Sequence, residues 1–566
     1  MIDEAKVAIG TLPTGVQGLD TILGGGLPEY SLNLIAGNVG TGKTTLVQQI
    51  VFANATPERR ALVFTALGEP TLKMVRYQQQ FSFFDLAKVD DAVRYVNLND
   101  AILGDDLDAL FDAIVREVES MAPAIVVIDS FRAMVSGCEG PGHQEKDLLG
   151  FMQRLAITLM SWQVTTFLVG EYLEGDMLGN PVFNVADGIF WHSQVIERNN
   201  VVRKLQVLKA RGRCPMPGLH TFRITRDGVE IFPRLPVPLH VADGVPSSGR
   251  VTSGVATLDR MLCGGFLTGD SILIAGPAGT GKTLLAMHFI ADGVARGEPG
   301  VIAVFEEQPD RYLDRAASVG INLRSMIEAN VLRILYLRPL DLSVDETLHN
   351  IRVLVEQVGA HRVVIDSLSG FELAVAPSFR DEFREAFYRM IGTLSTVGIT
   401  VMMTVEVVES FTDLRFSPHA ISFLIDDIIL QRYVEIDGRI ERVMTVVKMR
   451  GSGHERDLRL YEIDQGGIQI GKTLKGYRGI LTGVPGKVKK GRPRALHPGL
   501  DATEARVLEA LTGRQEATAV ELLAQTGLER PALDRVLSRL LALDYAIRVR
   551  EGARTVYRPA ARALRR

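Results

Sequence analysis

The chain contains one long internal repeat, in which residues near the start recur 239 positions later. Lys43 returns as Lys282, and at the same spacing Lys209 returns as Lys448. Because two distant parts of the sequence share one offset, the pattern indicates duplication of a whole domain. The residues of the first copy that recur around its lysine are Gly15, Leu19, Asp20, Gly25, Gly26, Gly37, Gly40, Thr41, Gly42, Lys43 and Thr44.

Segments rich in Pro, Ser and Gly divide the chain. One junction lies near residue 240, and a basic Gly/Pro segment follows the second copy. Such composition is typical of linkers. We therefore expect two repeated domains at residues 1–240 and 241–482, a basic linker at 483–499 and a small domain at 500–566.

Short apolar, β-branched runs alternate with helical stretches in each copy. In the first copy, residues 31–36, 61–64 and 124–128 have the pattern of buried strands, and residues 44–53 and 107–121 that of helices. Continuous apolar strands between helices favour a mainly parallel sheet covered on both faces. The predicted fold class is α/β, with two tandem domains of this kind.

Composition excludes several classes of protein. Of the 566 residues, 46% are hydrophobic and 23% charged, which is too apolar for a disordered or fibrous chain. No apolar run is long enough to cross a bilayer, and the first residues lack the pattern of a signal peptide. Cys138, Cys214 and Cys263 form no ligand-like cluster. We expect a cytoplasmic protein without a membrane partner, a disulfide framework or a zinc site.

Each copy carries a complete P-loop between an apolar strand and a helix. The glycines let the backbone wrap phosphates, and the helix N-terminus adds exposed N–H groups. Lys43 and Lys282 are expected to neutralise the β- and γ-phosphates of ATP. The predicted ATP-binding residues are Gly37, Gly40, Thr41, Gly42, Lys43, Thr44 and Thr45 in the first copy, and Gly276, Gly279, Thr280, Gly281, Lys282, Thr283 and Leu284 in the second.

Ligands for Mg²⁺ are expected beside each P-loop. Thr44 and Thr283 would coordinate the ion directly, while Asp129 and Asp366 would hold its water shell. Each aspartate ends an apolar strand downstream of its P-loop. A buried strand often ends in a capping Asp, but recurrence beside both P-loops favours the metal role.

Hydrolysis also needs a group that orients or deprotonates water. The second copy offers Glu306 and Glu307 after its next strand. Without a gap they fall opposite Leu67 and Gly68 of the first copy; with a shift of one residue, Glu307 meets Glu69. In either alignment the first copy lacks the pair. The second domain is therefore predicted to be the better hydrolase, and the first to bind nucleotide mainly.

These motifs together resemble the KaiC-like proteins, tandem RecA-type ATPases of the circadian-clock kinase group. The similarity covers about residues 10–480, including both P-loops, the glutamate pair and two Lys-x-Arg-Gly motifs. It implies a ring of six subunits with ATP between neighbours. It also implies that Lys209, Arg211, Lys448 and Arg450 reach the nucleotide of the adjacent subunit. A basic surface strand is the plainer alternative for these motifs.

Clock-type members of that group phosphorylate themselves on an adjacent Ser-Thr pair. At the equivalent place this chain has Ser422, but Phe423 stands at the threonine position. The resemblance therefore supports an ATPase strongly and a two-site kinase cycle weakly. A serine that packs or caps is the alternative for Ser422.

The last part of the chain departs from the clock proteins and is basic. Residues 487–566 hold 17 Lys and Arg against 9 Asp and Glu, although the whole chain has a net charge of −4. Residues 503–511, 519–525 and 531–543 have helical spacing, and two strand-like segments follow, at residues 546–550 and 554–558. This order resembles a winged helix-turn-helix, a fold that binds DNA or a protein partner.

Candidate DNA contacts lie in this tail and in the linker before it. The linker is similar to an AT-hook, whose Arg-Pro core fits a narrow minor groove, and a flexible basic linker is the alternative. The predicted DNA-contacting arginines are Arg492, Arg494, Arg530, Arg535, Arg539, Arg548, Arg550 and Arg554.

Three functions compete at this point. The sequence favours an ATP-driven signalling or regulatory homo-hexamer whose tail engages DNA or a regulatory protein. A clock-type Ser/Thr autokinase acting on Ser422 is the first alternative. A RecA-type DNA-processing motor is the second, although an acidic ATPase body is poorly suited to gripping a phosphate backbone.

Overall fold

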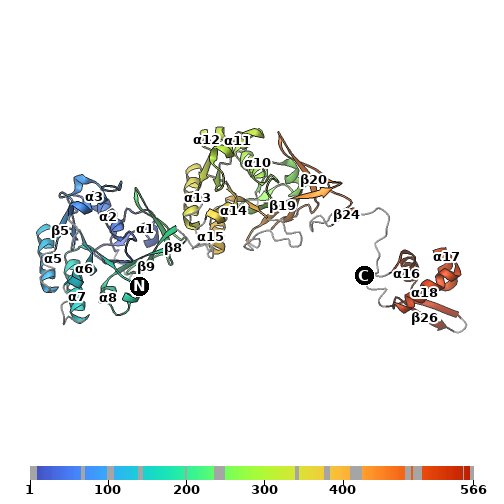
Figure 1. The fold of residues 1–566 in the computed structure, drawn as a ribbon, viewed down its shortest axis with the longest axis horizontal. Helices are drawn as coiled ribbons and strands as arrows, with labels where there is room; N and C mark the ends of the chain where they lie inside the picture. The colour runs from blue at the N-terminus through green and yellow to red at the C-terminus, as the bar shows by residue number, and fades with distance from the viewer. Residues whose placement is uncertain are drawn as a thin grey trace, which may run out of the picture. The chain divides into compact units, whose positions relative to one another are not determined.

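The computed structural model describes residues 9–65, 71–98, 107–137, 145–197, 200–234, 249–337, 343–374, 383–407, 424–478, 486–487, 500–551 and 554–560. Contacts within the chain define two compact units, residues 1–474 and 475–566. The first unit holds both copies of the repeat, and the second holds the basic tail (Figure 1).

The first copy is built on a nine-stranded sheet in the order β11-β10-β9-β8-β3-β7-β6-β4-β5. Its strands are β3 (Leu32–Gly37), β4 (Ala61–Thr65), β5 (Val93–Asn97), β6 (Ile125–Asp129), β7 (Thr165–Glu171), β8 (Gly188–Glu197), β9 (Asn200–Ala210), β10 (His220–Thr225) and β11 (Gly228–Phe232). Six neighbouring strands of this sheet are parallel: β8, β3, β7, β6, β4 and β5. Strands β9, β10 and β11 extend the sheet beyond β8 in antiparallel fashion. The helices are α1 (Leu19–Leu23), α2 (Lys43–Asn54), α3 (Thr71–Gln78), α5 (Leu107–Met121), α6 (Phe131–Gly137), α7 (Glu145–Ser161) and α8 (Pro181–Val185).

The second copy repeats this topology strand for strand, in the order β16-β15-β17-β18-β14-β19-β20-β21-β22. Its strands are β14 (Ser271–Gly276), β15 (Gly300–Val304), β16 (Leu332–Tyr336), β17 (Arg362–Asp366), β18 (Thr400–Glu406), β19 (Asp427–Ile436), β20 (Arg439–Lys448), β21 (Arg459–Asp464) and β22 (Gly467–Thr473). Its helices are α9 (Ala256–Met261), α10 (Lys282–Ala295), α11 (Pro309–Ser318), α12 (Leu323–Glu328), α13 (Val344–Val358), α14 (Leu368–Ala374) and α15 (Phe383–Thr396). The predicted α/β class is confirmed, and the three antiparallel strands beyond the parallel core of each sheet, β9 to β11 and β20 to β22, were not predicted.

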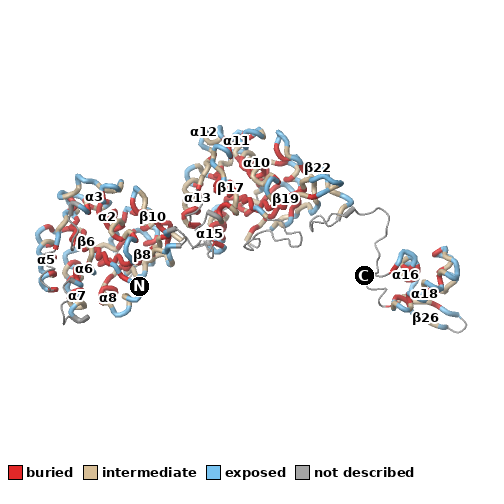
Figure 2. Tube along the Cα trace, in the orientation of Figure 1, coloured by how far each residue is buried: buried red, intermediate tan, exposed pale blue. Residues whose placement is uncertain are grey.

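Both faces of each central strand are buried, as Figure 2 shows by its red strands. In the first copy, Leu34 and Ile128 belong to the cluster that includes α5 and α7. Their neighbours Ile35 and Val127 belong to the cluster on α2. Burying one such side chain is worth about 1.5–3 kcal/mol, so the alternating pattern holds a helix layer on each face.

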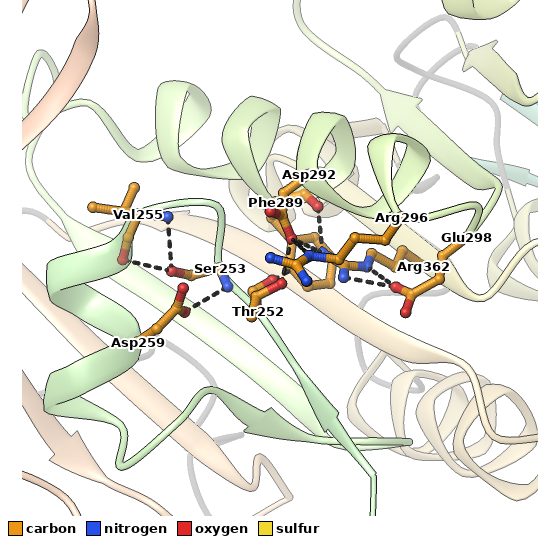
Figure 3. A network of polar contacts seen from close by, with 9 residues as sticks. All are labelled: Thr252, Ser253, Val255, Asp259, Phe289, Asp292, Arg296, Glu298 and Arg362. Atoms are coloured by element: carbon orange, nitrogen blue, oxygen red, sulfur yellow. Dashed lines mark hydrogen bonds and ion pairs between the residues drawn. The ribbon is translucent and has the colours of Figure 1, made fainter.

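At the amino end of β17, a buried arginine links several segments of the second copy. The Arg362 side chain is 1% exposed and bonds to Glu298 at 2.7 Å and to the carbonyl oxygens of Thr252 and Phe289 at 2.8 and 2.6 Å. It also stacks on the Phe289 ring and lies 3.6 Å from Asp292 (Figure 3). The network joins α10, β17 and the segment entering the domain, whereas the matching residue of the first copy is Ile125.

The tail folds around its own core of leucines. It consists of α16 (Ala502–Arg514), β25 (Ala517–Thr518), α17 (Ala519–Thr526), α18 (Arg530–Ala542), β26 (Ala546–Glu551) and β27 (Arg554–Pro559). Capping boxes at Asp501 and Thr518 fix the starts of α16 and α17, because each cap and its glutamate satisfy free backbone N–H groups. The predicted three helices and hairpin are confirmed, and β25 adds a third strand beside β27.

Candidate nucleotide-binding sites

Each P-loop lies where a central strand ends and a helix begins. Gly42 and Gly281 precede α2 and α10 with φ of 83° and 94°, a left-handed conformation that glycine adopts without strain. The Lys43 amine donates to the carbonyl oxygens of Gly37 at 2.9 Å and Asn38 at 2.7 Å. Lys282 donates to the Pro277 carbonyl oxygen at 2.8 Å. Both lysines are thus held inside the loops that the sequence predicted for them.

Carboxylates surround both lysines. Burial lowers the pKa of Lys43 and of Lys282, while nearby carboxylates act in the opposite direction. Two of these carboxylates, Glu171 and Glu406, end β7 and β18 and were missed by sequence analysis. Their recurrence after equivalent apolar strands was the signal that would have identified them.

The residues predicted to hold Mg²⁺ lie together in both copies. The Thr44 hydroxyl donates to Asp129 Oδ2 at 2.7 Å. In the second copy, Thr283 and Thr404 both donate to Asp366, the latter at 2.5 Å. Hydroxyl and carboxylate oxygens are the hard donors that Mg²⁺ prefers, so this donor set fits the ion.

A cavity opens beside each P-loop. That of the first copy measures about 320 Å³ and is lined by Gly40, Thr41, Gly42, Lys43, Thr44, Thr45, Asp129, Ser130, Val169, Gly170, Glu171 and Ile224. That of the second copy measures about 540 Å³, and its lining includes Thr283 and Asp366. The side chain of Leu284, a residue predicted to contact nucleotide, packs in the apolar core.

Glu306 and Glu307 face the larger cavity together with Thr283 and Asp366. The Ser367 hydroxyl donates to Glu306 Oε1 at 2.8 Å. Arg315 Nη2 lies 2.7 Å from Glu307 Oε1. The second copy therefore has two oriented carboxylates within its nucleotide site.

The strand register relates this pair to the first copy. Thr65 is the partner of Asp129, and Val304 is the partner of Asp366. Counting outward from these matched residues, Glu306 and Glu307 correspond to Leu67 and Gly68. Glu69 lies in the 66–70 segment, outside the described residues.

The two Lys-x-Arg motifs lie at the opposite edge of their sheets from the P-loops. Arg211 Nη1 lies 3.0 Å from Asp187 Oδ1, and Asp187 Oδ2 accepts from the N–H of Leu32, at the amino end of β3. Arg450 and Asp426 repeat this arrangement at 3.3 Å beside β14. The lysines bond locally: Lys209 donates to the Asn184 carbonyl at 3.1 Å and Lys448 to that of Ile425.

The predicted DNA contacts of the tail have different surroundings. Arg539 on α18 pairs at 3.0 Å with Glu504, whose side chain is 3% exposed. Arg530 pairs with Asp534 on the surface of the same helix. Exposed arginines at positions 535, 548, 550 and 554 lie on α18 and on the hairpin. Arg492, Arg494 and Ser422 fall outside the described residues.

Two P-loop sites in tandem RecA-like sheets, followed by a winged helix, define a class of tandem P-loop ATPase with an added winged-helix domain. The family model for the KaiC ATPase matches residues 12–235 and again 251–475. The chain belongs to the KaiC ATPase family. A second model, described as the sugar-specific transcriptional regulator TrmB, matches residues 497–562.

Curated relatives show the same extent of similarity. The circadian clock protein KaiC3 of Synechocystis sp. (strain ATCC 27184 / PCC 6803 / Kazusa) is 31% identical over 502 residues, 86% of this chain and 96% of the relative. The circadian clock oscillator protein KaiC of Acaryochloris marina (strain MBIC 11017) is 30% identical over 507 residues, 87% of this chain and 95% of the relative. Within the described residues, no helix has both the length and the apolar character needed to cross a membrane.

Proposed function

We propose that this chain is an ATP-hydrolysing regulatory protein in which the second domain carries most of the hydrolysis. The observation that carries this proposal is the glutamate pair facing the cavity beside Thr283 and Asp366. The first domain has Leu67 and Gly68 at the matching positions. We assign to it nucleotide binding with little turnover.

In the proposed reaction, the residues of the second domain divide the work. Lys282 neutralises charge on the β- and γ-phosphates, which lowers the barrier to phosphoryl transfer. Thr283 and Asp366 would hold Mg²⁺, which supplies further charge neutralisation when bound. Glu307, or Glu306 beside it, orients water and accepts its proton.

We further propose that the chain forms a homo-hexameric ring in which a neighbouring subunit completes each ATP-binding site. Asp187, the partner of Arg211, lies at the amino end of β3, and the P-loop follows its carboxyl end. Six residues of strand span about 17 Å, so Arg211 is too far away to touch phosphates bound in its own domain. The same argument applies to Arg450. A nucleotide in an adjacent copy is the ligand that fits such a motif.

The tail is proposed to bind DNA in response to the nucleotide state. The TrmB similarity and the exposed arginines on α18 and the hairpin support this assignment. Six tails brought together by ring assembly would also bind more tightly than one, because assembly raises their local concentration.

The central experiment follows free phosphate and protein label together. Purified protein is incubated with γ-labelled ATP and Mg²⁺, beside the Glu306→Gln/Glu307→Gln double variant. We expect phosphate release by the natural chain and its loss, by about 100-fold or more, in the variant. Equal release by the two proteins would refute the role of the pair.

The same experiment decides the autokinase alternative. Label on the protein at Ser422 that disappears in the double variant would establish phosphotransfer to a single acceptor. Free phosphate without any protein label would exclude it. Stimulation of phosphate release by DNA would favour the DNA-processing motor.

A further inference from the structure

The cavity of the second domain is lined by cationic side chains as well as by the glutamate pair. Besides Glu306 and Glu307, its lining includes Gln308, Arg311 and Arg315. Arg311 and Arg315 are four residues apart on α11, so they share one helix face. Tyr336, at the end of β16, forms part of the same wall. This region adds two positive charges to a site whose other lining charges are negative.

The two arginines differ in their present partners. Arg315 is bound to Glu307 at 2.7 Å, in a pair whose arginine side chain is 53% exposed. Solvent-exposed pairs of this kind are weak and exchange partners readily. Within the described part of the chain, Arg311 has no ion-pair partner, although its side chain faces the cavity. One guanidinium is therefore unengaged and the other is loosely held.

The first domain provides an internal comparison. Pro70 and Pro309 occupy matching positions, which places Leu72 opposite Arg311 and Arg76 opposite Arg315. The first copy thus lacks both the second arginine and the glutamate pair. The two features occur together only in the domain to which we assign hydrolysis, which suggests that they serve the same reaction.

We propose that the part of the cavity lining formed by Arg311 and Arg315 is a binding site for inorganic phosphate, the product of hydrolysis. The inference rests on the proposed ATPase activity. Planar guanidinium groups with paired N–H donors are the side chains best matched to a phosphate anion. The cavity of about 540 Å³ that these two arginines line together with Thr283 and Asp366 has room for a phosphate group.

The chemistry of the reaction couples product formation to this site. The water oxygen forms a bond to the γ-phosphorus while the bond between the γ-phosphorus and the β–γ bridging oxygen breaks. The electron pair of the broken bond leaves with ADP. One proton of the water moves to Glu307. The protonated Glu307 carries no charge, so it no longer attracts Arg315. The guanidinium groups of Arg315 and Arg311 are then both free to bind the product, hydrogen phosphate, which carries two negative charges.

The test measures phosphate binding directly. Full-length protein is loaded with ADP and Mg²⁺, and binding of radiolabelled inorganic phosphate is followed by equilibrium dialysis. The test variant is Arg311→Ala, with Arg311→Lys to retain charge without the planar fork. The matched control is Arg324→Ala, because Arg324 pairs with Asp310 and Asp314 on the surface and does not line the cavity. Thermal melting of each variant verifies folding.

We expect Arg311→Ala to weaken phosphate binding by about tenfold or more, since hydrogen bonds to charged groups are the strong ones. Arg311→Lys should give an intermediate loss, and Arg324→Ala none. Inhibition of hydrolysis by added phosphate should weaken in the same order.

Two results would overturn the inference. One is an absence of phosphate binding by the natural chain; the other is equal binding by Arg311→Ala and Arg324→Ala. Hydrolysis with either result would leave the ATPase assignment standing and remove the phosphate site. Arginine-dependent phosphate binding without hydrolysis would support the site and refute the assigned activity.

Discussion

The two copies share their P-loop residues but differ at the two positions where the second copy carries its glutamate pair. Glu306 and Glu307 face the second cavity, and the matching residues of the first copy are Leu67 and Gly68. A strand and a P-loop can therefore be duplicated intact while the chemistry diverges. The difference is testable by disabling one site at a time.

Removal of one P-loop lysine at a time should separate the domains. We expect Lys282→Ala to lower phosphate release by about 100-fold, because a charge aimed at the transferring phosphoryl group is lost. Lys43→Ala should leave most of the release intact. The measurement is steady-state phosphate release at saturating ATP. A larger loss in Lys43→Ala than in Lys282→Ala would reverse our assignment of the domains, and Glu69→Gln would then be the variant to examine.

The buried arginine of Figure 3 should contribute strongly to the stability of the second domain. Arg362→Ala leaves Glu298 without its partner and opens space against Phe289, so we expect a loss of about 3–5 kcal/mol. Arg296→Ala is the matched control, because the Arg296 side chain is exposed and its pair with Asp292 should matter far less. Urea unfolding measures both. Similar losses in the two variants would contradict the role assigned to the network.

A buried carboxyl pair should make the second domain sensitive to pH. Burial and the neighbouring carboxylates raise the pKa of Asp427 to about 8 and that of Asp270 to about 6. In the unfolded chain both titrate near about 4, so the folded chain binds protons more tightly. This stability is fully present below about pH 4 and is lost as the pH rises from there through about 6 to 8.

The measurement is the melting temperature between pH 5.5 and 9. It should fall with rising pH in the natural chain, and Asp427→Asn should flatten the fall. The first copy, with Ser31 and Gly188 at these positions, should show no such dependence when only its transition is followed. A natural chain that gains stability toward pH 9 would refute the prediction.

At the scale of elements, the arginines of α18 in the tail have different surroundings. Arg539 neutralises Glu504, which is buried at the start of α16. Arg535 lies exposed on the same helix. The sequence assigned both residues to DNA because helical spacing does not reveal which of them meets a carboxylate from another helix.

Substitution of these two arginines should therefore have different effects. Arg535→Ala should weaken DNA binding. It should also reduce the slope of log affinity against log salt concentration by about 1, as expected for one lost phosphate contact. Arg539→Ala should lower the melting temperature of the tail, because the buried Glu504 carboxylate loses its ion pair with Arg539. The measurements are DNA titrations at several salt concentrations and thermal melting. Loss of DNA affinity in Arg539→Ala with unchanged melting would restore Arg539 as a DNA contact.

At the scale of the whole molecule, the Lys-x-Arg motifs predict that activity depends on neighbouring subunits. Arg450→Ala has an intact P-loop but lacks the trans contact, and Lys282→Ala has the converse defect. Each variant alone should hydrolyse ATP poorly. Mixed rings should recover activity, because the Lys282→Ala subunit supplies Arg450 to its neighbour.

The measurement is phosphate release as a function of the mixing ratio, with light scattering to follow assembly. Lys43→Ala mixed with Lys282→Ala serves as a control, because Lys43→Ala keeps both its second-domain P-loop and Arg450, so phosphate release should only scale with its share of the mixture. If Arg450→Ala and Lys282→Ala mixtures remain as inactive as the separate proteins in rings of the same size, the trans assignment is wrong.

Much of this protein follows from local sequence. The P-loops, the α/β fold and the winged-helix tail were predicted because each depends on spacing within a short segment: a glycine pattern before a helix, apolar runs, or helical periodicity. Duplication strengthened the predictions for the two repeated domains, because their local patterns appeared twice. These features are fixed by neighbours in the chain, so the order of residues alone determines them.

Other features depend on residues that are distant in the chain. Glu171 and Glu406 approach the P-loop lysines because β7 and β18 pair with β3 and β14. Arg539 meets Glu504 through helix packing, and Arg211 lies at the far edge of its sheet because β9 runs antiparallel to β8. Electrostatic contacts depend on distance in space, which strand order and packing set. The tertiary structure alone therefore decided which charges are paired.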